Sequence, residues 1–131
     1  ENLDWVGADY RVEKCNASEI GSTWGRRSDC VFAFDPPYGR SSWKSEDGLD
    51  LFLSALSSAR EVDPEGVIST MLPTGPEVLS QNLEEEFIVM GKKWSELEDL
   101  IAQRGWRVVL KSPIKVHRSL ARMVIVCHPS D

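Results

Sequence analysis

The chain has 131 residues, of which 41% are apolar and 27% are charged. This is the composition of one ordinary globular domain, large enough to bury a core. No apolar run approaches the roughly 20 residues that a membrane-spanning helix needs, and no basic and apolar leader is present. We therefore expect a soluble, cytoplasmic protein without a membrane partner.

The net charge of −6 argues at first against a nucleic-acid partner, because surfaces that follow phosphates are basic. The charge is unevenly distributed, however. Residues 1–103 hold 9 Lys and Arg against 20 Asp and Glu, a balance of −11. Residues 104–122 hold six basic residues and no acidic one, a balance of +6. The acidic average conceals a basic segment that could contact phosphates.

The three cysteines are scattered along the chain, at positions 15, 30 and 127. Neither they nor the two histidines, His117 and His128, show the C-x-x-C or H-x-x-x-H spacing of metal ligands. We expect buried free thiols and no metal site.

The first half of the chain predicts alternating strands and helices. A short strand at 10–15 leads into a polar connection at 18–29 that can hold a helical turn. Five apolar residues at 30–34 predict a strand buried on both faces. Apolar spacing predicts a helix from about Gly48 to Val62, and the next strand covers 67–72. A Pro/Gly break at 73–76 ends that strand beside the end of the first.

The second half predicts one helix and a hairpin. Residues 77–90 give no clear assignment. Ser95 caps a helix over 96–103 with Glu98 in capping-box position. The strands 106–111 and 121–127 have no helix between them and should pair antiparallel around a loop at 112–120. The expected fold is α/β, a mainly parallel sheet closed by an antiparallel C-terminal hairpin.

The loop Asp35-Pro36-Pro37-Tyr38-Gly39 follows the apolar strand directly. Ligands bind at the carboxyl ends of strands in open α/β sheets, and the prolines hold Asp35 and Pro36 extended. The Asp35 carboxylate and the Pro36 carbonyl could accept both N–H groups of an aromatic amine and so make its nitrogen more nucleophilic. Tyr38 could stack on the base. The alternative is a plain strand-ending turn with a core aromatic.

Two motifs together resemble a known family. Asp-Pro-Pro-Tyr at a strand end is typical of Rossmann-like S-adenosylmethionine methyltransferases that modify exocyclic amino groups. DPPYGRSS at 35–42, combined with HRSLAR at 117–122, resembles the archaeal and eukaryotic tRNA guanine-N2 methyltransferases that act on guanosine 10 and carry a THUMP domain. The resemblance implies S-adenosylmethionine as cofactor and tRNA as partner.

The resemblance also implies roles for individual residues. Catalysis would use Asp35, Pro36 and Tyr38, and cofactor binding would use Asn16, Ala17, Asp35 and Pro37. Asn16 stands where the family usually has Asp, and its carbonyl can still accept from an adenine amino group. Substrate binding would use Pro37, Gly39, Arg40, Ser41, Thr74, His117, Arg118 and Arg122. For Arg40, Ser41 and Thr74 a structural role in their loops fits nearly as well, and the basic hairpin could be a solvated face.

The resemblance covers only part of the family's catalytic domain. The chain has no G-x-G loop for the cofactor's methionine part, so 1–131 is expected to be a single partial catalytic domain, inactive alone. The missing strands would leave strand 30–34 with an open edge, completed by an upstream segment or a second copy. Alternative functions are an adenine-N6 or other amino methyltransferase on DNA or rRNA, and a non-catalytic RNA-binding or assembly module.

Overall fold

The structure is a computed structural model that describes residues 6–35 and 45–130. Its helical elements are the 3-10 helices η1 (Ala17–Glu19) and η2 (Pro76–Ser80) and the α-helices α2 (Ile20–Trp24), α3 (Ser45–Val62) and α4 (Trp94–Gln103). Its strands are β1 (Val31–Phe34), β2 (Val67–Thr74), β3 (Ile88–Val89), β4 (Lys92–Lys93), β5 (Trp106–His117) and β6 (Leu120–Pro129). Within these residues no helix is long and apolar enough to cross a bilayer.

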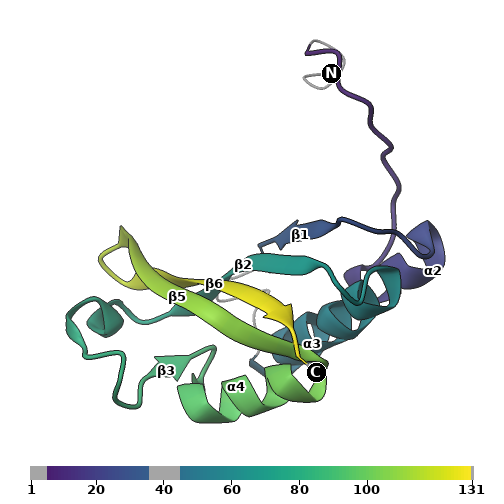
Figure 1. The fold of residues 1–131 in the computed structure, drawn as a ribbon. Helices are drawn as coiled ribbons and strands as arrows, with labels where there is room; N and C mark the ends of the chain where they lie inside the picture. The colour runs from purple at the N-terminus through teal and green to yellow at the C-terminus, as the bar shows by residue number, and fades with distance from the viewer. Residues whose placement is uncertain (1–5, 36–44, 131) are drawn as a thin grey trace.

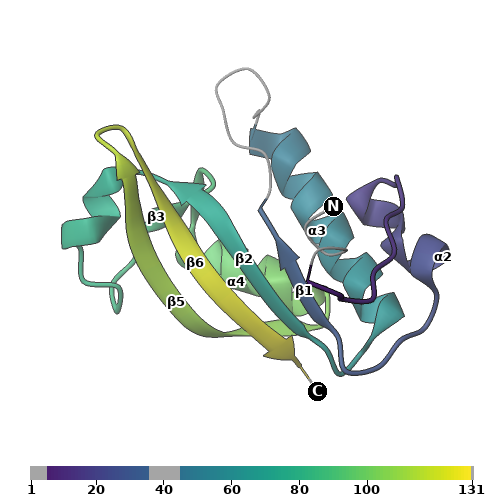
Figure 2. The same cartoon turned by 90° about the horizontal axis from the view of Figure 1, so that it is seen from above.

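All six strands belong to one sheet. Figure 2 shows β5, β6, β2 and β1 side by side in that order. β3 pairs with the last residue of β2, and β4 pairs with β3. β2 is central because it pairs with β6 along seven residues, with β1 at its start and with β3 at its end. The long strands β5 and β6 form the expected hairpin.

The expectation of a mainly parallel sheet is wrong. Only β1 and β2 pair in parallel, joined by the helical crossover α3. Every other described ladder is antiparallel. The reason is the position of β6. The hairpin turns the chain back so that β6 lies between β2 and β5, antiparallel to both, whereas a parallel pair requires a crossover connection.

The core lies between the sheet and the helices α3 and α4, which cover the same face (Figure 1). Alternate residues of β2 and β6, such as Ile68, Leu72, Met123 and Ile125, are fully buried on that face. The residues between them, on the opposite face, are half-buried. The predicted burial of strand 30–34 on both faces is therefore wrong, since Val31 is 68% exposed and Ala33 is also exposed.

Several predicted boundaries shift. Helix α3 begins at Ser45, three residues earlier than expected, and β2 continues through Pro73 and Thr74. The predicted loop at 112–120 is wrong, because both hairpin strands extend to a tight turn. Ser95 is not the N-cap of α4. Its backbone N–H and hydroxyl both donate to the Glu86 carboxylate, at 3.0 and 2.7 Å, and these bonds lower the pKa of Glu86.

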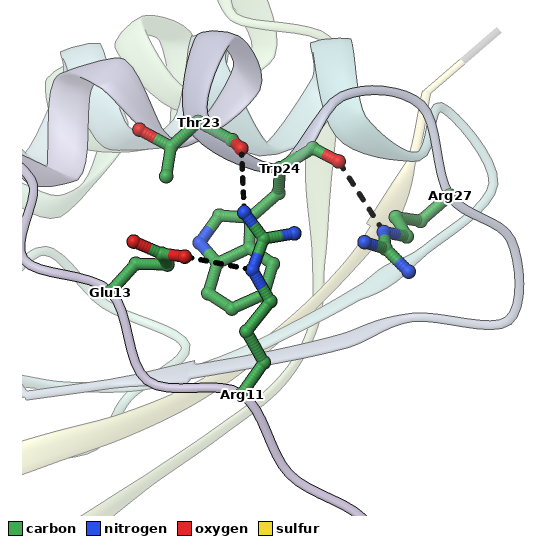
Figure 3. Close-up of polar contacts among 5 residues, drawn as sticks. All are labelled: Arg11, Glu13, Thr23, Trp24 and Arg27. Carbon is green, nitrogen blue, oxygen red and sulfur yellow. Dashed lines mark hydrogen bonds and ion pairs between the residues drawn. The ribbon is translucent and has the colours of Figure 1, made fainter.

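Residues 10–15 do not form the predicted strand. They are exposed and joined to no described strand. Figure 3 shows Arg11 instead lying over the ring of Trp24, with its guanidinium 4.4 Å from the ring centroid and hydrogen-bonded to Glu13 and to the Thr23 carbonyl. The segment alternates apolar and polar residues, but it contacts α2 through Arg11 and does not join the sheet. A strand pattern becomes a strand only where a partner edge is in reach.

Strand β1 lies at the edge of the sheet, as the sequence predicted for residues 30–34. It is four residues long and pairs only with β2 among the described strands. Asp63 fixes its start, because its carboxylate accepts from the Cys30 N–H at 2.9 Å and the Glu65 N–H at 3.0 Å. These backbone bonds lower the pKa of Asp63. The turn after α3 thereby holds the beginning of β1 in register with β2.

Candidate active site

Asp35 lies directly after the last residue of β1, at the carboxyl end of the parallel pair. Its side chain is 42% exposed. One carboxylate oxygen, Oδ2, pairs with the guanidinium of Arg122 at 3.3 Å. The structure thus brings together two predicted site residues that are 87 positions apart, and it places the carboxylate where open α/β sheets bind their ligands.

Arg122 projects from β6 and reaches Asp35 across β2. Its backbone is opposite Pro73 on one side and Ile114 on the other, so two ladders fix its position. Its side chain is only 21% exposed, and Nη1 also lies 3.8 Å from the sulfur of Met71. The sequence assigned Arg122 to substrate phosphates together with Arg118. In the structure its guanidinium contacts the predicted catalytic carboxylate instead.

Six of the predicted site residues lie outside the described part of the chain. They are Pro36, Pro37, Tyr38, Gly39, Arg40 and Ser41. Their roles in catalysis, cofactor binding and substrate binding remain predictions from the sequence.

Thr74 ends β2 and is buried, with 8% of its surface exposed. Its hydroxyl donates to the Ile88 carbonyl at 2.5 Å, which joins β2 to β3. The parallel pairing of β1 with β2 confirms that the ends of both strands point to the same edge. The hydroxyl that was predicted to line the substrate cleft is engaged in holding the sheet together.

His117 and Arg118 lie at the tip of the hairpin, where both are exposed. The His117 ring nitrogen Nδ1 accepts a hydrogen bond from the Ser119 N–H at 3.1 Å, which closes the turn. The β2 ladder ends at Ala121, so the tip extends beyond β2. The tip is therefore an exposed basic surface, and its contact with substrate phosphates stays a prediction from the sequence.

Asn16 and Ala17, predicted to contact the adenine of the cofactor, lie at the start of η1. The Asn16 side chain caps this helix, since its carbonyl oxygen accepts from the Ser18 N–H at 3.0 Å and the Ser18 hydroxyl at 2.9 Å. The oxygen assigned to the adenine amino group is therefore already an acceptor within the protein. Ala17 faces an apolar pocket that extends to β1.

This pocket, of about 630 Å³, runs along the whole of β1 between η1, α2 and α3. Its walls are mainly apolar and aromatic. They include Ala17, Ile20, Trp24, Val31, Phe32 and Phe34. The volume lies within the range of about 300–1,000 Å³ that is usual for small-molecule sites. The sequence did not predict the wall formed by Ile20 and Trp24, because neither residue stands in a recognisable motif.

The mainly apolar walls of the pocket could hold the adenosine part of S-adenosylmethionine. Apolar and aromatic walls suit a purine ring, and Ala17 and Phe34, the residue before Asp35, both line the pocket. A glycine-rich loop for the methionine part is absent from the sequence. The described histidines, cysteines and acids form no group of three that could bind a metal.

The cysteines are free, and only one of them is fully buried. Burial raises the pKa of Cys127 to about 12, so this thiol stays protonated. Cys30 is half-buried, and its pKa is raised by burial and by the neighbouring Asp63 charge. Cys15 is exposed, which contradicts the expectation that all three are buried.

Comparison with known proteins finds similarity in structure but not in sequence. No family model matches the chain, and no curated protein matches it. A proposed DNA modification methylase from Thermus thermophilus superposes with a TM-score of 0.56 at 11% identity, over 88% of this chain and 51% of that one. A tryptophan-to-alanine variant of the 16S rRNA (adenine(1408)-N(1))-methyltransferase from Catenulisporales acidiphilia gives 0.45 at 16% identity, over 77% and 50%. At this identity the first likeness shows the fold alone, and the chain spans about half the length of that structure.

Proposed function

We propose that this chain is the catalytic part of an S-adenosylmethionine-dependent methyltransferase that modifies an exocyclic amino group of a nucleic acid. The observation that carries the proposal is Asp35, placed at the carboxyl end of β1 beside an apolar pocket and paired with Arg122. The fold it shares with the Thermus protein supports the proposal without naming a substrate.

The chemistry proposed for the site follows from what the target amine needs in order to accept a methyl group. S-adenosylmethionine supplies an electrophilic methyl group on a sulfonium sulfur. The Asp35 carboxylate would accept one N–H of the target amine, and the carbonyl that the sequence assigns to this role, that of Pro36, would accept the other. The nitrogen lone pair would then be directed toward the methyl group. Transfer of that methyl group would leave the electron pair of the C–S bond on sulfur and a positive charge on the amine. Asp35 stabilises that charge and can take up the proton the amine loses.

Guanine N2 in tRNA is the target that we propose. The support is the combination of DPPYGRSS with HRSLAR, together with the exposed basic tip of the hairpin at His117 and Arg118. The tip would contact the RNA backbone, while the loop after Asp35 receives the base taken out of its stack. Tyr38 would stack on that base.

The proposal extends to residues outside this chain. A Rossmann-like methyltransferase domain needs a glycine-rich loop for the methionine part of the cofactor, and we propose that another segment supplies it along the open edge of β1. Full activity would then belong to the longer assembly. The isolated chain would supply the amine-activating wall of the site.

A methyl-transfer assay tests the function directly. Radiolabelled S-adenosylmethionine is incubated with the longer assembly that completes the cofactor site and, in parallel, with tRNA, rRNA and duplex DNA. The methylated nucleoside is then identified by mass spectrometry. We expect N2-methylguanosine in tRNA. Methylation of adenine in DNA or rRNA would instead favour the amino methyltransferases of those substrates.

Asp35→Ala provides the sharpest variant in this assay. It should lower the rate by at least about 100-fold, because a positioned general base and charge stabiliser contributes on that order. Cofactor affinity, measured by calorimetry, should change little. Wild-type turnover that survives the substitution would remove Asp35 from the mechanism. RNA binding without any cofactor-dependent rise in melting temperature would favour the non-catalytic module.

A further inference from the structure

The ion pair between Arg122 and Asp35 suggests a role for Arg122 that the HRSLAR motif did not predict. We propose that Arg122 is a positioning residue that holds the Asp35 carboxylate for reaction, and that it is not a phosphate contact. This inference rests on the proposed function, because it assigns a second residue to the same site.

The geometry separates Arg122 from the basic residues near it in the sequence. Neighbouring strands lie about 4.8 Å apart, so a side chain from β6 must extend over β2 to reach the end of β1. Arg122 does so, with its guanidinium 3.3 Å from Asp35 and 3.8 Å from the sulfur of Met71. Arg118, four residues earlier, lies at the exposed tip of the hairpin. The two arginines of the HRSLAR motif therefore meet different surroundings.

The burial of its side chain also distinguishes Arg122 from Arg118. The Arg122 side chain is 21% exposed and lies among groups of the protein, whereas a phosphate contact must present its guanidinium to the solvent side. Its backbone is fixed by strands on both sides, at Pro73 and at Ile114. An arginine held in this way is a rigid anchor for a carboxylate, because its planar guanidinium loses little freedom when it binds.

Asp35 needs such an anchor because of where it lies. It follows a four-residue edge strand and its side chain is 42% exposed. Without a partner the carboxylate could adopt several rotamers, and only one would direct an oxygen toward the amine. Arg122 contacts Oδ2, and we assign to Oδ1 the role of accepting the amine N–H in the proposed reaction. Positioning of this kind can change a rate by about 100-fold for a displacement near 1 Å.

The test compares Arg122→Gln with Arg118→Gln as the matched control in the same hairpin. With tRNA and radiolabelled S-adenosylmethionine, Arg122→Gln should lower kcat by roughly 10- to 100-fold with little change in KM. Arg118→Gln should raise KM and reduce the slope of log KM against log salt by about 1, with kcat largely kept. Both variants should melt within a few degrees of the wild type, because Arg118 is exposed and the ion pair of Arg122 is open to solvent on its Asp35 side, where such pairs add little stability.

Two further variants distinguish positioning from packing. Arg122→Lys keeps the charge but loses the planar guanidinium, so it should recover only part of kcat. Arg122→Ala opens space next to Asp35, and added guanidinium chloride at millimolar concentration should restore part of its kcat. A residue that only packs would show neither effect.

The outcomes are distinct. If wild-type protein transfers methyl groups and Arg122→Gln behaves like Arg118→Gln, the positioning role is wrong and the proposed function stands. If the kcat loss appears but guanidinium restores nothing in Arg122→Ala, the role is also overturned, in favour of packing. If the wild-type longer assembly, with its cofactor site complete, transfers no methyl group to tRNA, rRNA or DNA, the proposed function fails and this role fails with it.

Discussion

Trp106 offers the most quantitative check on the packing described above. It is fully buried at the start of β5, and its indole N–H donates to the Leu56 carbonyl of α3 at 2.9 Å. This hydrogen bond connects the β5–β6 hairpin, which carries Arg122, to α3, the helix after the predicted active-site loop. Replacing it by phenylalanine keeps an aromatic ring but removes this hydrogen bond and part of the ring volume.

The expected cost of Trp106→Phe has two parts. Loss of the hydrogen bond costs about 0.5–1.5 kcal/mol. A residual cavity of roughly 40 Å³ costs about 1 kcal/mol more, at about 24 cal/mol per Å³. The free energy of unfolding should therefore fall by about 2 kcal/mol, which lowers the melting temperature of a chain of this length by about 7 °C.

Trp94→Phe is the matched control. Trp94 is also buried, at 5% exposure, and it stacks on Phe87 with ring centroids 5.2 Å apart. Its indole N–H has no hydrogen-bond partner within the described part of the chain. The substitution removes the same ring volume but no hydrogen bond, so it should cost about 1 kcal/mol less than Trp106→Phe. Differential scanning calorimetry of both variants measures the difference. A Trp94→Phe protein that melts at or below the temperature of Trp106→Phe would refute the reasoning.

Two further predictions concern stability. The folded-state pKa of Asp63 is lowered, so its contribution is complete above the unfolded value of about 3.9 and is lost as the pH falls through the folded-state pKa. Asp63→Asn should therefore melt below the wild type at pH 7, and the gap should close below about pH 4, whereas the exposed control Asp50→Asn should melt near the wild type at pH 7. Gly105 has φ +90°, and an added Cβ would lie 3.1 Å from the Arg60 side chain. Gly105→Ala should cost at least about 1–2 kcal/mol in chemical denaturation. Gly7→Ala, also at positive φ but with nothing within 4 Å, should cost less, and equal costs would contradict the role of Arg60.

Local patterns predicted the elements that depend on local interactions. The apolar runs at 30–34 and 67–72 and the helical spacing between them predicted β1, α3 and β2, and with them the parallel pair that places Asp35, although β2 extends two residues further than predicted. The same reasoning failed at 10–15, where the pattern of a strand is present but Arg11 binds α2. The pattern records which side chains could face a core, and it does not record whether a partner edge exists.

The sequence patterns could not predict contacts between residues that are far apart in the chain. Asp35 and Arg122 were each singled out, but for different roles, and their pairing depends on β6 lying next to β2. Thr74 and Asn16 show the converse. Both were assigned to ligands because they stand in suggestive motifs, yet the Thr74 hydroxyl and the Asn16 carbonyl make hydrogen bonds within the protein. A motif identifies polar groups without showing which of them the fold itself requires.

The short edge strand β1 has a consequence for the motion of the site. Its four residues are held by one parallel ladder, while β2 and β6 are each paired on both sides. Local opening of β1 should therefore require much less free energy than global unfolding, so its amide hydrogens should exchange earlier than those of β6. A ligand that bound along β1 would slow that exchange. The carboxylate proposed for catalysis thus stands at the end of the segment whose order is most sensitive to binding.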